Sequence, residues 1–323
     1  MRAFVFGVAG ALIAATAFAA ENWKAYSYLP NGKLAGAIGH QKIIDAVEKA
    51  SGGEVKIQLN LSGSLPIAAT DITQAVADNI VQFGDDGFFL GNITIGGILR
   101  QPMLIKDTAE YGKALAIMMP YVEQAYAKKG IIVLGTYNYP ASTVFGAKPI
   151  TKLEDLSGKK LRMTSPEQAA FLKAFGGSGI TISPPDVPSA LQRGAVDGAL
   201  TATSGGGRIW GDFFTHNYRL GTDFFQAFYI VNKASFDKLK PDVQKALREA
   251  AVKISPENTA QMVKEDDETL NALKAKGLIA TDPKPAEVAE ATKLMAPLWD
   301  EWAKSKGPEH VKAMAEVRKA LGK

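Results

Sequence analysis

Along the first part of the chain, the spacing of apolar residues changes from a period of two to a helical period and back. Residues 23–28 alternate like a strand, and residues 39–50 carry apolar side chains at helical spacing. A Ser-Gly-Gly turn leads to a second alternating strand over residues 55–59, and Asp71 is positioned to cap the helix that follows. This strand-helix-strand-helix order favours a largely parallel sheet with helices on its faces.

The same alternation of strands and helices recurs in the second half. Residues 131–134, 159–163 and 196–200 are predicted strands with helices between them. The last eighty residues are mainly helical: Pro241 opens a long amphipathic stretch, and Pro256 is expected to kink or divide it. The chain shows no fixed-period repeat and no low-complexity linker, so we expect two lobes joined by crossings of the chain.

The amino terminus is typical of a secretory signal peptide over residues 1–20. Arg2 is followed by an apolar run over residues 3–15 and by small residues, with cleavage expected after Ala19 or Ala20. This run is too short for a membrane span, and no later segment is apolar for roughly the 20 residues that a span requires. The sequence therefore predicts a soluble, exported protein that resides in the periplasm and does not insert into the membrane.

The amino-acid composition excludes some classes of function. The 323 residues are 46% hydrophobic, enough for a sizeable core in two domains. The chain has no cysteine, so disulfides and thiol chemistry are excluded. Removing Arg2 with the signal leaves 36 basic against 33 acidic side chains, and these are interspersed, as in residues 264–267. Nucleic-acid binding therefore has little support.

Catalytic and metal-binding motifs are not evident. His40, His216 and His310 lie far apart in sequence without the spacing of zinc ligands, and there is no GxSxG nucleophile elbow. We expect no cofactor, no metal and no catalytic residue. A secreted hydrolase stays an alternative, because catalytic groups can converge in space without leaving a motif.

The most informative stretch runs from Lys148 to Glu167. Arg162 lies near the carboxyl end of a predicted strand, where open α/β sheets bind their ligands. Beyond it, Ser165, Pro166 and Glu167 look like a helix N-cap, a first-turn proline and a first-turn acid. A guanidinium beside a helix amino terminus makes a carboxylate site. The alternative is that Arg162 pairs with a surface acid.

The second stretch runs from Pro184 to Gly207. Asp186 is placed to cap a short helix, Gly194 to end it, and the strand that follows delivers Thr201 to the sheet edge. Thr201 and Arg162 would thus lie at the same end of neighbouring strands. The glycines at 205–207 lack the lysine and spacing of a P-loop, which favours a flexible turn over a phosphate site.

Together these stretches resemble the substrate-binding proteins of tripartite ATP-independent periplasmic (TRAP) transporters, the DctP family. The resemblance rests on KPITKLEDLSGKKLRM, FGGSGITISPPDVPSALQRGAVDG and FYIVNKASFDKLKPDVQKALREAA, and it covers nearly the whole mature chain. It implies an α/β, class II-like periplasmic binding protein of two lobes, with mixed sheets flanked by helices and a long helix spanning both lobes. Lobe one would hold residues 21–139 and 226–265, and lobe two residues 140–225 and 266–323.

The resemblance also implies a ligand. In that family the arginine that ends the GKKLR strand clamps the ligand's carboxylate, and here it is Arg162. An asparagine usually stands three residues after VDG, where this chain has Thr201. Many members carry another arginine before the hinge strand, whereas this chain has Tyr139 to Thr143 there. A single cationic anchor favours a monocarboxylate, such as an aromatic or 2-oxo acid, over a dicarboxylate.

Further candidates follow from the positions that family ligands touch. Tyr28 follows the first strand, and Asp86 and Gly87 end the third. Asp86 could meet a hydroxyl, an ammonium or a cation of the ligand, or be a turn aspartate. Trp210 could stack on a flat ligand or belong to the core, and Pro184 and Ser165 complete the candidate binding residues.

The resemblance implies a non-catalytic binding protein. It would close around a small organic acid and deliver it to the small and large TRAP membrane subunits, with uptake driven by an ion gradient. The alternative partner is an ABC or tricarboxylate-type transporter.

Overall fold

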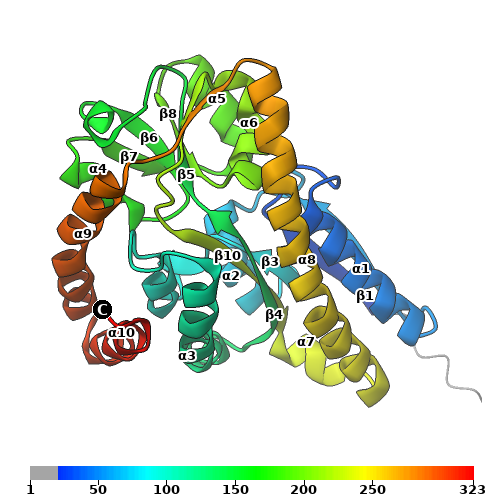
Figure 1. The fold of residues 1–323 in the computed structure, drawn as a ribbon. Coiled ribbons are helices and arrows are strands. Elements are labelled where there is room, and N and C mark those ends of the chain that lie inside the picture. The colour runs from blue at the N-terminus through cyan, green and yellow to red at the C-terminus, as the bar shows by residue number, and fades with distance from the viewer. Residues whose placement is uncertain (1–20) are drawn as a thin grey trace, which may run out of the picture.

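The fold is described by a computed structural model that covers residues 21–323 (Figure 1). The predicted signal peptide lies outside the described residues. Two mixed sheets, each flanked by helices, form two lobes, which we call lobe one and lobe two after the order in which the chain builds their sheets. The predicted fold class, a two-lobed α/β protein with mixed sheets flanked by helices, is confirmed.

The sheet of lobe one has the strand order β2-β1-β3-β10-β4. Its strands are β1 (Glu21–Ser27), β2 (Val55–Leu61), β3 (Phe83–Asp86), β4 (Ile131–Ala141) and β10 (Phe224–Asn232). The first three are parallel, and β10 runs antiparallel between β3 and β4 because it enters from the other lobe. The helices of this lobe are α1 (Ala35–Ala50), α2 (Ile72–Ala77), α3 (Thr108–Ala127) and α7 (Lys233–Lys238).

The sheet of lobe two has the order β11-β9-β5-β8-β6-β7. Its strands are β5 (Thr143–Gly146), β6 (Lys160–Met163), β7 (Ser178–Thr181), β8 (Gly198–Thr201), β9 (His216–Tyr218) and β11 (Ile279–Thr281). β6 pairs in parallel with both β7 and β8. The helices between these strands are α4 (Gln168–Ala174), α5 (Val187–Gln192) and the short α6 (Arg208–Trp210).

The two lobes are joined by paired crossings of the chain. Between β4 and β5, the Ser142 amide donates to the Asp223 carbonyl at 2.7 Å, and the Thr222 amide donates back to the Ser142 carbonyl at 2.8 Å. The long helix α8 (Pro241–Ala275) packs on α1 and β4 of lobe one and on the π-helical turn Thr203–Gly207 of lobe two. Pro256 lies inside α8 without dividing it. The expected helix spanning both lobes is therefore confirmed.

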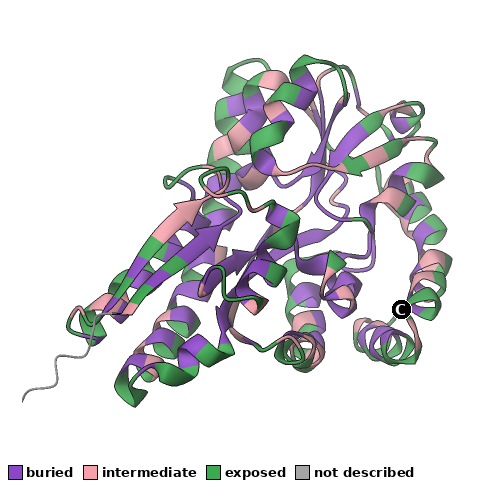
Figure 2. Ribbon diagram, turned by 180° about the vertical axis from the view of Figure 1, so that it is seen from behind, coloured by how far each residue is buried: buried purple, intermediate pink, exposed green. Residues whose placement is uncertain are grey.

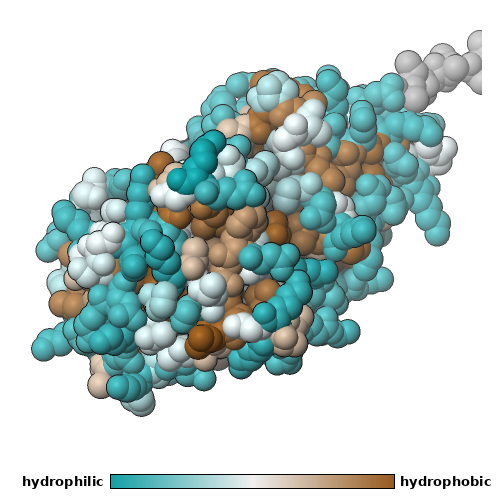
Figure 3. Space-filling view, turned by 90° about the horizontal axis from the view of Figure 1, so that it is seen from above, coloured by the Kyte–Doolittle hydropathy of each residue, from teal (hydrophilic) through white to brown (hydrophobic). Residues whose placement is uncertain are grey.

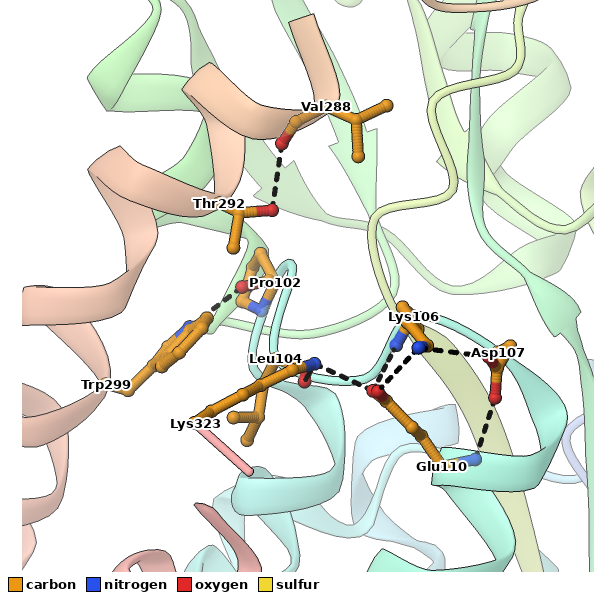
Figure 4. A network of polar contacts seen from close by, with 9 residues as sticks. All are labelled: Pro102, Leu104, Lys106, Asp107, Glu110, Val288, Thr292, Trp299 and Lys323. Carbon is orange, nitrogen blue, oxygen red and sulfur yellow. Dashed lines mark hydrogen bonds and ion pairs between the residues drawn. The ribbon is translucent and has the colours of Figure 1, made fainter. Parts of the chain in front are cut away.

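The last two helices, α9 (Pro285–Lys306) and α10 (Pro308–Leu321), also join the lobes (Figure 1). α9 packs on α4, and α10 packs on α3 of lobe one. Figure 4 shows two of the bonds that hold this end of the chain: Trp299 Nε1 donates to the Pro102 carbonyl at 2.9 Å, and Lys323 Nζ donates to Glu110 at 2.7 Å. The lobe boundaries stay a prediction, and within them α10 packs against lobe one rather than lobe two.

The buried residues follow the strands and the inner faces of the helices (Figure 2). β10 is buried along its whole length, as a central strand covered on both faces requires. Seen from above, hydrophobic atoms form a band between hydrophilic margins (Figure 3). Among residues 21–323, no helix combines the length and apolar character needed to cross a bilayer.

The predicted strands are confirmed, but three predicted helix caps are wrong. Asp71 and Asp186 stand at N-cap positions, yet their side chains make no capping bond. Ser165 is not a cap, because α4 begins only at Gln168 with Glu167 at its N-cap position. Gly194 does follow α5 and adopts the left-handed backbone, at φ 64°, that a chain reversal there needs.

Candidate functional site

A cavity lies between the lobes and draws its lining from both. It has a volume of about 40 Å³, room for roughly three water molecules. Lobe one, with its strands β4 and β10 that lead to the other lobe, contributes mainly aromatic side chains: Tyr28, Leu29, Phe88, Tyr139 and Phe225. Lobe two contributes Arg162, Thr164, Pro184, Thr201, Ala202, Gly205, Gly206, Ile209 and Trp210. The cavity is thus a small, largely apolar space with one guanidinium in its wall.

Arg162 is held at this wall by strand β6. Its side chain is only 2% exposed, and its Nε donates to the Ile182 carbonyl at 3.1 Å. Its guanidinium carbon lies 4.8 Å from the centre of the Trp210 ring and 5.7 Å from that of Phe88. No carboxylate within residues 21–323 forms an ion pair with it. The alternative of pairing with a surface acid is therefore wrong.

Burying the charge of Arg162 without an anion destabilises the folded protein. Burial, together with the Arg100 cation, lowers the pKa of Arg162 from 12.5 to about 9. The group is still protonated at neutral pH, so the wall carries a buried positive charge without a counterion. A small carboxylate supplies both the missing charge and acceptors for the terminal N–H groups.

Thr201 reaches the same cavity because its strand is parallel to that of Arg162. Arg162 is in register with Ala199 of β8, so Thr201 stands two residues further toward the carboxyl end. Its Oγ1 accepts from the Gly206 amide at 3.1 Å. A Cβ at Gly206 would lie 2.4 Å from the Trp210 ring, so only glycine permits this close approach.

The Thr203–Gly207 segment, expected as a flexible turn, forms a single π-helical turn beside the cavity. The Ser204 amide donates to Asp266 Oδ1 of α8 at 2.8 Å, which ties the turn to the long helix.

Lobe one supplies an aromatic wall. The ring centres of Tyr28, Phe88 and Phe225 lie 5.6 to 5.7 Å apart in each pair. Tyr139 packs edge to face on Phe225 at 5.4 Å. Gly87 stands behind this wall, since a Cβ there would come within 2.6 Å of Phe225 and 2.9 Å of Tyr28. The wall suits the flat or apolar body of a ligand.

The structure brings together five of the eight predicted binding residues. Tyr28, Arg162, Pro184, Thr201 and Trp210 all line the cavity. Trp210 is also 2% exposed, so it serves the core and the cavity wall at once.

The other three, Ser165, Asp86 and Gly87, do not line the cavity. Ser165 is buried beside α4, and Gly87 shapes the wall only through its missing side chain. Asp86 is fully buried and accepts hydrogen bonds from Thr73 and Tyr126, away from the cavity. Burial raises the pKa of Asp86 to about 7.

Sequence reasoning missed two important residues, Phe225 and Arg100. Phe225 lines the cavity from β10, and Arg100 lies behind it with its guanidinium carbon 4.0 Å from the ring centre. Arg100 is fully buried and donates to Gln226 at 2.6 Å and to the Gly87 carbonyl at 3.0 Å. Neither residue belongs to a motif, so only the fold places them here.

Metal binding finds no support in the part of the chain that the structure describes, where no three His, Cys, Asp or Glu side chains gather to hold an ion. His40, the most deeply buried histidine, packs edge-on against Phe83 at 4.3 Å between ring centres. Its two ring nitrogens have no hydrogen-bond partner, so it serves the core as a neutral imidazole.

Two curated proteins are similar to this chain in sequence. Over 189 residues, the chain is 31% identical to the uncharacterized protein YiiZ of Salmonella typhimurium, covering 52% of this chain and about half, 55%, of that one. It is 24% identical over 254 residues to the 2,3-diketo-L-gulonate-binding periplasmic protein YiaO of Escherichia coli, covering 76% of each chain.

Among solved structures, the fold is similar to that of DctP6 of Bordetella pertussis, an extracytoplasmic solute receptor binding pyroglutamic acid. The TM-score is 0.85 at 22% identity, over 92% of this chain and 99% of that one. The model of family 7 of the bacterial extracellular solute-binding proteins, named DctP, matches residues 36–306. The chain therefore belongs to the DctP family of bacterial extracellular solute-binding proteins and is, as the sequence predicts, a binding protein rather than an enzyme.

Proposed function

We propose that this protein captures a small monocarboxylate with an apolar or aromatic body in the periplasm and delivers it to a TRAP-type transporter. One observation carries the proposal: Arg162 is buried in the wall of the interlobe cavity and has no ion pair within residues 21–323. A carboxylate that binds there forms charge-assisted bonds to a guanidinium already positioned by Ile182 and Trp210.

The rest of the cavity favours a ligand with a single negative charge. Arg162 is the one cationic side chain in its lining, and the remaining wall is mainly aromatic or aliphatic. A second carboxylate would be desolvated there without a partner. Thr201 supplies a hydroxyl beside the anchor: its oxygen accepts from the Gly206 amide, and its proton is left to donate to the ligand. The body of the ligand would pack on Tyr28, Phe88 and Phe225.

Delivery follows from the position of the cavity between the lobes. A ligand that contacts Arg162 of lobe two and Tyr28 of lobe one stabilises the closed arrangement, because only that arrangement offers both contacts. The paired crossings at Ser142 and Thr222 are the segments about which such closure would occur. The small and large membrane subunits would recognise the closed form, and an ion gradient would drive uptake.

The comparisons support a carboxylate ligand. Pyroglutamic acid, bound by DctP6, and 2,3-diketo-L-gulonate, bound by YiaO, are both monocarboxylates.

A thermal-shift screen tests the proposal. Aliphatic, aromatic, 2-oxo and amino acids, with pyroglutamate among them, would each be compared with the corresponding primary amide, which has the same shape without the charge. A ligand at ~100 times its dissociation constant adds roughly 2.7 kcal/mol to stability, a shift of several degrees. We expect at least one acid to shift the melting temperature and its amide to have no effect. Equal shifts by acids and amides would contradict a carboxylate anchor.

A further inference from the structure

A chain of hydroxyl groups leads from the cavity wall to a buried acid. The Tyr139 and Tyr28 hydroxyl oxygens lie 3.0 Å apart, and those of Tyr28 and Tyr137 lie 3.2 Å apart. Tyr137 donates to Asp85 at 2.9 Å from Oδ1 and 3.1 Å from Oδ2. Tyr139 and Tyr28 line the cavity, whereas Tyr137 and Asp85 are buried behind them. These hydroxyl groups therefore connect the cavity to an acid that lies outside its lining.

The charge of Asp85 fixes the direction of this chain. An ionised carboxylate only accepts hydrogen bonds, and a tyrosine hydroxyl has one proton to donate. Ser27 Oγ donates to Asp85 Oδ2 at 2.7 Å while it accepts from the Leu29 amide. Tyr137 must likewise give its proton to Asp85, so it accepts from Tyr28. Every proton in the chain then points toward Asp85.

The direction determines what the cavity offers. Tyr28 donates to Tyr137 and so accepts from Tyr139. Within residues 21–323, the Tyr139 hydroxyl has no hydrogen-bond partner other than Tyr28. Its only proton is committed to Tyr28, and its lone pairs are all that remain for a ligand. At the aromatic wall, the cavity is therefore a hydrogen-bond acceptor.

We propose that the Tyr139–Tyr28–Tyr137–Asp85 chain determines ligand specificity by selecting a carboxylate whose body carries a hydrogen-bond donor, a hydroxyl or an N–H group. The inference rests on the proposed function, which places the carboxylate on Arg162. It adds a second point of recognition, on the aromatic side of the cavity, and distinguishes donor-bearing acids from oxo acids and lactones of the same shape. A ligand with an acceptor at that place would face lone pairs and lose a hydrogen bond.

Protonation of Asp85 reverses the direction of every hydrogen bond in this chain of hydroxyl groups. With Oδ2 occupied by Ser27, the added proton lies on Oδ1 and is donated to Tyr137. Tyr137 then donates to Tyr28, Tyr28 to Tyr139, and Tyr139 has a proton free for the cavity. Burial is the main cause that raises the pKa of Asp85 to about 7. Binding of a donor-bearing acid should therefore strengthen as the pH rises through this range, because such a ligand requires ionised Asp85.

Other ionisable groups lie close to Asp85 and need a control. They are Asp86 on the same strand, Tyr28 after β1, Tyr137 and Tyr139 on β4, Tyr229 on β10 and, beside Tyr229, His40 on α1. The tyrosine pKa values are raised further by burial, and burial lowers the pKa of His40 to about 3. Asp86 is thus the one neighbour that titrates in the same range as Asp85.

The test compares ligands that differ only in the donor. Pyroglutamate and 5-oxotetrahydrofuran-2-carboxylate differ by N–H against ring oxygen, and mandelate and phenylglyoxylate differ by hydroxyl against ketone. Calorimetry of the full mature protein would give the dissociation constants. At about pH 7.5 we expect the donor-bearing member of a binding pair to bind about 10-fold more tightly. At about pH 6, where Asp85 is mostly protonated, its affinity should fall by about 4-fold if the protonated form binds it 10-fold more weakly, and by about 8-fold if that form does not bind it.

Three variants distinguish the effect of the Tyr139–Tyr28–Tyr137–Asp85 hydrogen bonds from that of the Arg162 carboxylate site. Asp85→Asn accepts through oxygen and donates through nitrogen, so it no longer fixes a direction, and the preference and its pH dependence should both disappear. Tyr139→Phe removes the terminal hydroxyl and should also abolish the preference. The matched control is Asp86→Asn, a buried neighbour that faces Thr73 and Tyr126, and it should keep both properties.

The outcomes distinguish the two proposals. If Asp85→Asn retains the wild-type preference, or if Asp86→Asn loses it, the chain does not select the ligand, although the carboxylate anchor stands. If wild-type protein binds the oxo or lactone member more tightly at about pH 7.5, the assigned direction is wrong. If it binds no member of either pair at millimolar concentration while uncharged analogues bind, the proposed function fails, and the inference fails with it.

Discussion

Replacing Arg162 with methionine should separate ligand binding from folding. The side chain is 2% exposed, and its Nε donates a hydrogen bond to the Ile182 carbonyl at 3.1 Å. Methionine keeps the length and flexibility needed to pack on Trp210 and Phe88 while removing the buried charge. Affinity and stability should then change in opposite directions, which a merely destabilising substitution would not produce.

The magnitudes follow from the burial of the charge. Loss of one partner of a buried ion pair costs about 2–5 kcal/mol of binding, roughly a 30- to 5,000-fold rise in dissociation constant. In the ligand-free protein, the pKa of Arg162 falls from 12.5 to about 9. At about 1.4 kcal/mol per unit, burying the charged form disfavours folding by several kcal/mol. The Ile182 carbonyl loses its donor at a cost of about 1–3 kcal/mol, so we expect a net stabilisation of about 2–4 kcal/mol.

Calorimetry would measure the affinity of an acid that binds the wild type, and urea denaturation would measure the free energy of unfolding. Arg193→Met is the matched control, since Arg193 is exposed at the end of α5 and should keep wild-type affinity. A variant at Arg162 that binds the acid normally would refute the anchor. One that loses several kcal/mol of stability without ligand would refute the absence of an internal counterion.

Three further predictions concern the core and the cavity wall. Burial lowers the pKa of His40 to about 3, so on acidification the unfolded protein binds the proton before the folded protein does. The contribution of neutral His40 to the free energy of unfolding is therefore complete above about pH 6.5. It falls by about 1.4 kcal/mol for each pH unit between about pH 6.5 and pH 3. His40→Leu should reduce the slope of unfolding free energy against pH by that amount between about pH 6 and 4, and an unchanged slope would contradict a buried neutral imidazole. Gly87→Ala should displace Phe225, 2.6 Å from the new Cβ, cost about 1–3 kcal/mol of stability and weaken acid binding; wild-type affinity by calorimetry would show that the wall tolerates a methyl group. Trp299→Phe removes the bond to the Pro102 carbonyl, so urea denaturation should show a loss of about 1–3 kcal/mol with affinity unchanged, and a large change in affinity would mean that α9 acts on the cavity.

Much of the fold could be predicted because the periods of its elements are strong. The strands over residues 23–28 and 55–59 and the parallel arrangement of β6 and β8 follow from alternation and from the order of elements. Parallel strands end at one edge of a sheet, so Arg162 and Thr201 could be placed together from sequence. Pro256 does not divide α8, because the packing of α8 on α1 and β4 maintains the helix through a position without an amide donor.

The far wall of the cavity could not be predicted in the same way. Successive side chains on a strand point to opposite faces, and nothing local decides which of Asp85 and Asp86 turns toward the cavity side. In the structure it is Asp85 that reaches Tyr137, while Asp86 turns to Tyr126. Phe225 arrives on a strand more than a hundred residues further along the chain, and its place depends on the antiparallel insertion of β10.

The most direct test of the central claim is a crystal structure of the mature protein with a bound acid, either retained through purification or found in the screen. The carboxylate should lie in the interlobe cavity with its two oxygens about 2.8 Å from the terminal nitrogens of Arg162, and the ligand body should pack on Tyr28 and Phe225. A ligand bound elsewhere, or bound in this cavity with its carboxylate directed away from Arg162, would contradict the proposed anchor.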